Sequence, residues 1–142
     1  MKRRYKYLLL GLGGIWVVAM LFLTPKFIRL HSETNEVLGA VSDYSNNLVA
    51  QQYARAYQYS SNAFRAALPY DKFVQLYQDL QARYGALTAV KRQACEVNGR
   101  GAPLVWKAII DEDFVYEKRT IRFEFVLHKE DGRWVVFSAE EL

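Results

Sequence analysis

The chain has 142 residues, of which 51% are hydrophobic, and a formal net charge of +4. Residues 1–29 hold six basic and no acidic groups, which leaves 13 basic and 15 acidic groups in the rest of the chain. Because the rest of the chain is mildly acidic, the positive net charge of the whole chain is no evidence that the protein binds nucleic acid. The single cysteine, Cys95, excludes an intramolecular disulfide, and we expect a small buried thiol or an intermolecular bridge.

An uncharged run of nineteen residues, from Tyr7 to Pro25, lies between Lys6 and Lys26. As a helix it would be about 28 Å long, close to the hydrocarbon thickness of a bilayer. We therefore predict a retained transmembrane signal anchor. A cleaved signal peptide is disfavoured because no small-x-small site follows Ala19. The side chains assigned to the membrane anchor are Tyr7, Leu8, Leu9, Leu10, Ile15, Trp16, Val17, Val18, Leu21, Phe22 and Leu23.

The distribution of basic residues around this run predicts its orientation. Two basic residues, Lys26 and Arg29, follow the run, and four precede it: Lys2, Arg3, Arg4 and Lys6. The positive-inside bias places the N-terminus in the cytoplasm and the later residues outside it. We expect a single-pass protein of the bacterial inner membrane with a periplasmic or extracytoplasmic C-terminal domain. Its parts would be residues 1–29 as tail and anchor, 30–35 as linker and 36–142 as the folded domain.

Helical periodicity follows the linker, in which Ser32 or Thr34 is the candidate N-cap. Two apolar stripes with the spacing i, i+4, i+7 and i+11 predict amphipathic helices. The first stripe is Val37, Val41, Tyr44 and Leu48, and the second is Phe73, Tyr77, Leu80 and Tyr84.

Between the two stripes, Tyr53, Tyr57 and Phe64 continue an apolar face, while the polar residues 60–62 predict a bend or a break. Pro69 ends this region, and Gly85 occupies the position typical of a glycine after a helix C-terminus. The first half is therefore predicted to be helical, in two or three pieces.

The second half changes to strand-like sequence. Residues 87–97 predict a strand closed by a glycine-rich turn at 98–101. Three further strands are predicted, at 104–116, 119–129 and 133–139, and Asp131-Gly132 is a strong two-residue hairpin signal before the last. Helices followed by strands favour an α+β domain with a four-stranded antiparallel sheet.

The turns predict a strand register. The expected pairs are Phe125 with Ser138, Leu127 with Val136, Lys129 with Trp134, Phe114 with Ile121, Ile110 with Phe125, and Ala108 with Leu127. One face then gathers Trp106, Ile110, Phe114, Ile121, Phe123, Phe125 and Leu127. On the other face Asp113 opposes Arg122 favourably, whereas Asp111 opposes Glu124 unfavourably, a conflict that a bulge near Asp111 would relieve.

Two stretches carry packing positions of a known family, NNLVAQQYARAYQYSSNAFRAALPYDKFVQLYQDLQARYG and the terminal hairpin EDGRWVV. The positions are Leu48, Ala50, Tyr53, Ala56, Tyr57, Phe64, Phe73, Leu80, Gly85 and Trp134. With these residues the chain resembles the bacterial branch of the nuclear transport factor 2-like (cystatin-like, SnoaL-like) superfamily over roughly residues 35–142.

The resemblance implies a cone-shaped domain of two or three helices packed on a curved four-stranded antiparallel sheet. Single-pass bacterial proteins with such a domain include the inner-membrane scaffold of type IV secretion and oxidase-assembly factors. Enzymes of the superfamily, such as steroid isomerases and dehydratases, place an Asp, His or Tyr inside an apolar cavity. The matching positions are packing positions, so they speak to fold more than to function.

Glu112 is the sharpest candidate for chemistry, because the predicted register places it on the face of Trp106, Ile110 and Phe114. A carboxylate buried there would have a raised pKa and could act as a general base. The favoured alternative is a bulge in Asp111-Glu112-Asp113 that turns Glu112 to solvent. A ligand cavity, if present, would be lined by Tyr53, Tyr57, Trp106 and Glu112.

Other polar groups give weaker patterns. Asp111 and Asp113 could converge with Glu124 on a hard cation, but Arg122 on the same face would neutralise them. Neither His31 nor His128 forms a metal or nucleophilic set with Cys95. We expect no metal and no cofactor.

The domain is rich in tyrosine, and buried hydroxyls need partners. We rank core packing first, an interface second and a ligand cavity third for Tyr44, Tyr53, Tyr57, Tyr59, Tyr70, Tyr77, Tyr84 and Tyr116. The leading expectation is a non-enzymatic membrane protein whose partners are the bilayer and other membrane or envelope subunits. The alternatives are a cone that binds a lipid or a small apolar ligand and, third, an isomerase- or dehydratase-type enzyme that uses Glu112.

Overall fold

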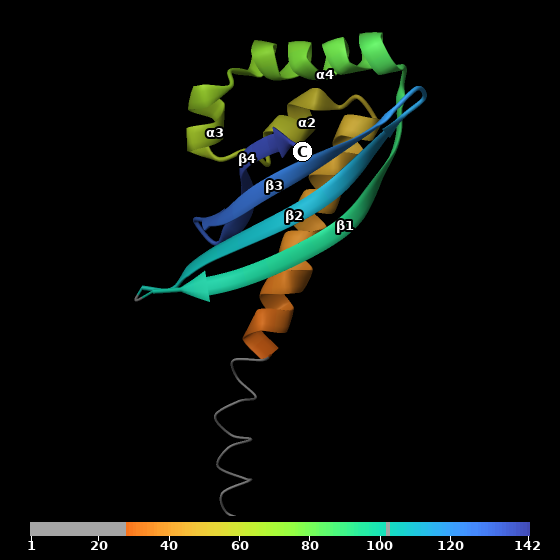
Figure 1. Ribbon diagram of the computed structural model, residues 1–142. Helices are drawn as coiled ribbons and strands as arrows, with labels where there is room; N and C mark the ends of the chain where they lie inside the picture. The colour runs from red at the N-terminus through yellow and green to blue at the C-terminus, as the bar shows by residue number, and fades with distance from the viewer. Residues whose placement is uncertain (1–27, 102) are drawn as a thin grey trace, which may run out of the picture. The chain divides into compact units, whose positions relative to one another are not determined.

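The computed structural model describes residues 28–101 and 103–142 (Figure 1). The chain divides between Thr34 and Asn35 into two units, and the later unit holds the sheet described below. The predicted anchor, with Lys2, Arg3, Arg4 and Lys6, lies outside the described residues. Within those that are described, no helix is both long and apolar enough to cross a bilayer.

The first helix covers residues 28–49 of the described chain. The expected start at Ser32 or Thr34 is therefore wrong, and residues 30–35 are helical. Thr34 is not a cap, because its Oγ1 donates a hydrogen bond to the carbonyl oxygen of Leu30 at 2.8 Å. The predicted stripe is confirmed, since all four of its members are buried: Val37, Val41, Tyr44 and Leu48.

Three further helices follow, α2 (Tyr53–Tyr57), α3 (Asn62–Ala67) and α4 (Tyr70–Tyr84). The predicted break is confirmed, and Ser61 caps the helix that follows it, α3: its Oγ accepts a hydrogen bond from the Phe64 N–H at 3.0 Å. The break yields two short helices, so the described chain has four helices rather than the expected two or three.

Helix α4 ends as its sequence predicts. Gly85 follows it with φ +83°, and its N–H donates to the carbonyl oxygen of Gln81. A Cβ at this position would lie within 2.8 Å of the Cβ of Glu117, so both the backbone conformation and the space require glycine.

The sheet contains β1 (Leu87–Arg100), β2 (Val105–Tyr116), β3 (Thr120–Glu130) and β4 (Arg133–Glu141), antiparallel and in sequence order. The predicted glycine-rich turn at 98–101 was placed too early, because Asn98, Gly99 and Arg100 still pair with β2. Gly99 lies under the Trp106 ring, where a Cβ would come within 3.1 Å of ring carbons. The glycine thus lets the Trp106 ring pack closely against the strand.

Most of the predicted register is confirmed. All three expected β2–β3 pairs are present, and Asp113 opposes Arg122. Leu127 opposes Val136 and Lys129 opposes Trp134, but the pairing of Phe125 with Ser138 is wrong. Phe125 faces Ala139 because the register shifts by one residue between Val126 and Leu127. Asp131 (φ +48°) and Gly132 (φ +76°) form the predicted hairpin turn.

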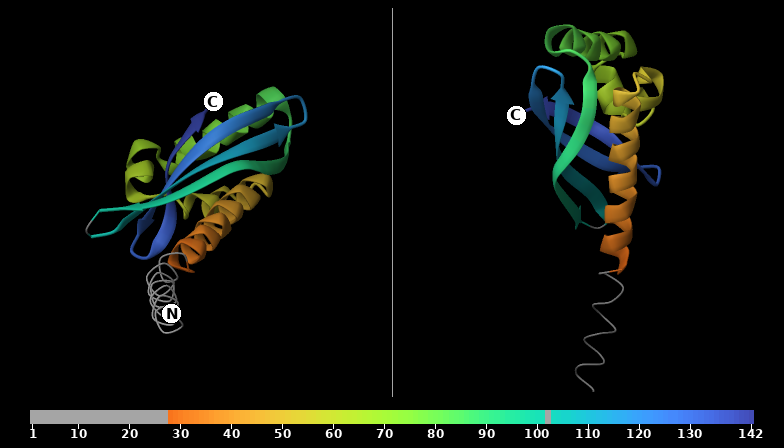
Figure 2. Two further views of the ribbon diagram at one scale, coloured as in Figure 1. Left: turned by 60° about the horizontal axis from the view of Figure 1, so that its bottom comes forward. Right: turned by 90° about the vertical axis from the view of Figure 1, so that its right-hand side faces the viewer.

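Figure 2 shows that, within residues 35–142, the helices lie against one face of the sheet, here called the inner face, and leave the other, outer face uncovered. The space between helices and sheet is filled by aromatic rings. Tyr44 from the first helix contacts Phe73 of α4 and Phe125 of β3, with ring centroids 6.4 Å and 5.6 Å apart. Phe114 stacks on Phe125 at 5.8 Å, and all four rings are fully buried.

Candidate functional site

Glu112 lies on the inner face of β2 and only 2% of it is exposed. The favoured expectation that a bulge would turn it to solvent is wrong. Strand β2 pairs with β3 without interruption through Asp111, Glu112 and Asp113, so these residues alternate between the two faces. The irregularity lies instead in β1, between Arg92 and Ala94. Asp111 therefore remains opposite Glu124, with no bulge between β2 and β3 to relieve the conflict.

Three elements supply the surroundings of the Glu112 carboxylate. Ser45, on the first helix, donates from Oγ to Glu112 Oε2 at 2.5 Å. Arg92, directly opposite on β1, donates from Nη2 to Oε1 at 3.3 Å. The same Arg92 nitrogen donates to Ser42 Oγ at 2.8 Å. The cluster thus joins the first helix to the two neighbouring strands.

Opposing effects act on the pKa of Glu112. Burial raises the pKa of Glu112, and the hydrogen bond from Ser45 and the charge of Arg92 partly oppose that rise. A carboxyl of this kind can take up a proton closer to neutral pH than an exposed one. Beside it is a depression of about 270 Å³ lined by Ser42, Ser45, Asn46, Val90, Arg92 and Glu112. Its lining is mostly polar, which suits a small polar molecule better than an apolar one.

The four candidates for a ligand cavity are not brought together. Trp106 lies six residues from Glu112 on the same strand, a separation of about 20 Å. The Tyr53 ring stacks on Tyr77, and the Tyr57 hydroxyl donates to the carbonyl oxygen of Leu68 at 2.8 Å. Packed aromatic rings fill the space between helices and sheet in which such a cavity would lie.

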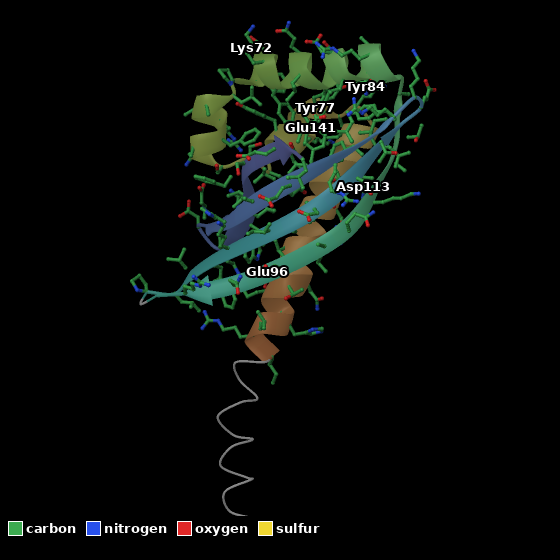
Figure 3. All side chains as sticks on the ribbon, viewed as in Figure 1. Lys72, Tyr77, Tyr84, Glu96, Asp113 and Glu141 are labelled. Atoms are coloured by element: carbon green, nitrogen blue, oxygen red, sulfur yellow. The ribbon has the colours of Figure 1, made fainter. Side chains whose placement is uncertain are left out.

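Buried tyrosines form a second polar group, around Tyr77, which reaches from α4 toward the sheet (Figure 3). The hydroxyls of Tyr44 and Tyr77 lie 3.0 Å apart, and burial raises the pKa of both. Tyr116 is also buried, yet its hydroxyl has no hydrogen-bond partner within the described part of the chain. Tyr44, Tyr77 and Tyr116 are therefore core residues, the role ranked first for the tyrosines.

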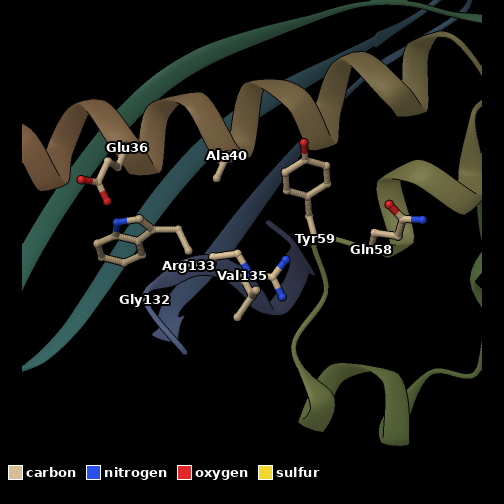
Figure 4. A pocket seen from close by; sticks show the side chains of 8 residues that line it. Glu36, Ala40, Gln58, Tyr59, Gly132, Arg133 and Val135 are labelled. Carbon is tan, nitrogen blue, oxygen red and sulfur yellow. The ribbon is translucent and has the colours of Figure 1, made fainter.

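Figure 4 shows a depression that sequence reasoning missed, between the first helix and the β3–β4 hairpin. It measures about 410 Å³ and is lined by Glu36, Ala40, Gln58, Tyr59, Gly132, Arg133, Trp134 and Val135. Glu36 Oε2 accepts from Lys129 Nζ at 2.9 Å, and the Tyr59 hydroxyl donates to Asp43 Oδ2 at 3.1 Å. Of the residues that line this depression, Trp134, next to the hairpin turn, had been singled out from the sequence as a packing position.

The outer face of the sheet carries exposed apolar side chains. Val105 is 60% exposed and Phe137 is 40% exposed, and His128 stacks on Phe137 with ring centroids 4.4 Å apart. Burial lowers the pKa of His128, and Lys107 adds to that effect. These side chains adjoin a depression of about 380 Å³ lined by Glu96, Asn98, Arg100, Val105, Lys107, Ile109 and His128.

The other candidate residues lie at separate places in the fold. Cys95 is exposed, so the expectation of a buried thiol is wrong. Arg122 pairs with Asp113 at 2.7 Å, as the register implied. Residues 28–101 and 103–142 contain no group of three or more His, Cys, Asp or Glu side chains placed to hold a metal ion. His31 is exposed on the first helix.

Comparison with known proteins adds no assignment: no family model matches the chain, and no curated protein matches it.

Proposed function

We propose that the protein is a non-enzymatic, single-pass membrane protein whose cone-shaped, nuclear transport factor 2-like domain docks onto another subunit of a membrane or envelope complex. The observation that carries this proposal is the exposed apolar surface on the outer face of the sheet. We define the outer patch as Val105, Ile109, Val126, His128 and Phe137. The strand register and the alternation along β2 place Val105, Ile109, Val126 and His128 on the uncovered face. The β3–β4 register skips Phe137, which lies on that face because its ring stacks on His128.

An apolar surface left exposed next to a depression is a feature of interaction sites. Arg100 and Lys107 line the same depression as Val105. A partner that fits would insert an apolar side chain beside Val105 and present a carboxylate to Arg100 or Lys107. The filled interior supports docking over binding of a lipid or small apolar ligand, because aromatic rings occupy the space that such a ligand would need.

The test uses the full-length protein in mild detergent, with a photo-reactive amino acid in place of Phe137. We expect one defined partner to cross-link there, to co-purify stoichiometrically with the unmodified protein, and to be lost in the variant Val105→Asp. The control is Leu76→Asp on α4, which is also an exposed apolar residue (43%, against 60% for Val105) but lies away from the patch. Recovery as a lone protein, or equal loss in both variants, would overturn the proposal.

A second candidate function rests on Glu112, because its burial beside a polar depression is the arrangement expected of an acid or base. In this case the protein would bind a small polar molecule at Ser45, Arg92 and Glu112 and exchange a proton with it. The variant Glu112→Gln would then abolish function while leaving stability unchanged or improved. Retention of function in that variant would exclude this candidate.

A further inference from the structure

The two edge strands of the sheet, β1 and β4, differ in whether other backbone groups cover their outward sides. Strand β4 is covered at its centre, where the Ser61 N–H donates to the carbonyl oxygen of Val136 at 2.8 Å and the Val136 N–H donates to that of Tyr59 at 2.7 Å. Strand β1 forms the opposite edge, and in the described parts of the chain no backbone group from a loop or helix pairs with its outward side. Residues 91–96 of β1 are all exposed. An open edge of this length can pair with another strand.

We propose that two copies of the chain pair antiparallel through their β1 edges, with the two-fold axis between Gln93 and Ala94, so that two sheets become one. In a two-fold interface, residue i of one copy faces residue j of the other, and the reverse also holds. This centre places Lys91 opposite Glu96 of the second copy and Arg92 opposite Cys95. One step further out, Val90 lies opposite Val97.

Residues that pair across the proposed dimer must lie on the same face of the combined sheet, and the register shift in β1 makes this possible. Residues paired across a ladder share a face of the sheet, so the β1–β2 pairing reports the face of each β1 residue. Lys91 pairs with Asp113 and Glu96 pairs with Ile109, which places both on the outer face. An uninterrupted strand would put residues 91 and 96 on opposite faces, but the register shift between Arg92 and Ala94 returns them to the same one.

The residues that pair on the inner face, Val90 and Val97, also lie on the same face of β1. Val90 pairs with Phe114 and Val97 pairs with Ala108, and both partners are buried inner-face residues. The proposed dimer therefore sets valine against valine on the inner face. On the outer face it sets lysine against glutamate, twice by symmetry. Figure 3 shows Glu96 on β1 near its open edge.

Charges and bulges on an edge strand can also serve to prevent pairing. Edge charges oppose pairing most strongly when they meet like charges in the paired register. Here the charges that meet are opposite, and the bulge lies at the symmetry axis. A strand pair of this size is smaller than a standard stable interface, so we expect a weak dimer. Confinement of both copies to one membrane, as the proposed anchor implies, would raise its population.

The first experiment is disulfide trapping in the full-length protein in detergent. In the variant Lys91→Cys/Glu96→Cys/Cys95→Ser, each new cysteine faces its partner across the proposed ladder at a distance that suits a disulfide. Within one chain the two positions are roughly 15 Å apart, which excludes an internal bond. Mild oxidation should convert the protein to a reducible species of twice the chain mass.

The controls are Lys91→Cys/Cys95→Ser and Glu96→Cys/Cys95→Ser. In the proposed register, identical positions in the two copies are offset by about five residues, so these variants should remain monomeric. A triple variant that stays monomeric while its thermal unfolding is unchanged would overturn the proposal. Equal cross-linking of the single-cysteine variants would overturn the register.

The second experiment exchanges charges and measures self-association by light scattering or mass photometry. Lys91→Glu or Glu96→Lys alone places like charges opposite each other twice, and each should weaken the dimer about tenfold. The double variant Lys91→Glu/Glu96→Lys restores opposite charges and should recover the native affinity. Additive loss in the double variant, or no change in either single variant, would contradict the pairing. Neither experiment depends on the partner proposed for the outer patch.

Discussion

Arg92 on β1 and Glu112 on β2 lie directly opposite each other on the inner face, with Arg92 Nη2 3.3 Å from Glu112 Oε1. The two groups differ in burial: 29% of the arginine side chain is exposed, against 2% of the glutamate. The buried carboxylate therefore depends on the arginine and on Ser45 for its stabilisation, while water also solvates the arginine. This asymmetry governs how substitutions at the two positions should behave.

Replacing Glu112 with glutamine should leave the thermal unfolding midpoint at neutral pH unchanged or raise it. The substitution removes a buried charge and keeps an oxygen that can accept from Ser45, so the gain is up to about 2 kcal/mol in the free energy of unfolding. Thermal unfolding followed by circular dichroism checks the change, with Ser42→Ala as the control near the same arginine. A midpoint well below that of the native protein would refute this account of the carboxylate.

The same group predicts a dependence of stability on pH. Because burial raises the pKa of Glu112, the native state keeps this proton at pH values at which the unfolded chain has released it. Stability should therefore fall as the pH rises from the ordinary carboxyl pKa through the raised one. Unfolding midpoints measured across that range in the native protein and in Glu112→Gln should converge at the acidic end and separate above it.

Replacing Arg92 with methionine should destabilise the fold by about 1–3 kcal/mol at neutral pH, because it leaves a buried carboxylate without its cation. The double variant Arg92→Met/Glu112→Gln should recover most of that loss. Denaturant or thermal unfolding of the four proteins gives the coupling between the two positions. Additive effects would mean that the pair does not interact.

The buried tyrosines give a matched pair of substitutions. Tyr77→Phe breaks the 3.0 Å hydroxyl contact with Tyr44 and should cost about 1–2 kcal/mol in the free energy of unfolding. Tyr116→Phe removes a buried hydroxyl that has no partner in the described chain, and should be neutral or slightly stabilising. Both rings stay in place, so the difference in unfolding midpoint isolates the hydroxyl. A costly Tyr116→Phe would indicate a bound water or ligand at that hydroxyl.

On the outer face, Arg122 should control the titration of Asp113. The hydrogen bond from Arg122 is the main cause that lowers the pKa of Asp113, and Gln93 donates to the same carboxylate at 2.7 Å. Arg122→Gln should therefore move the Asp113 pKa up toward its ordinary value, as read by NMR of the side-chain carboxyl. The contribution of the Arg122–Asp113 pair to folding stability is present at neutral pH and is lost as the pH falls through the lowered pKa of Asp113. Arg119→Gln, which removes a guanidinium stacked on Tyr84, should leave Asp113 unchanged.

Local patterns alone determined most of the secondary structure. The spacing of Val37, Val41, Tyr44 and Leu48 specifies a helix, because only a 3.6-residue period places all four on one side. Asp131-Gly132 specifies the last turn, because both residues adopt the positive φ that a tight hairpin needs. Once that turn and the β2–β3 turn are placed, pairing follows by counting, which is why Asp113 and Arg122 could be matched in advance.

Only the tertiary structure decided the position of the irregularities and the environment of the polar groups. Three successive acids favour a bulge by their solvation, yet the bulge lies on the neighbouring strand β1, between Arg92 and Ala94. Ser45 is 67 residues from Glu112 in the chain, and no local pattern joins a helix hydroxyl to a strand carboxylate over that distance. Burial of Glu112 and exposure of Cys95 likewise depend on which faces the helices cover, a result of packing among distant elements.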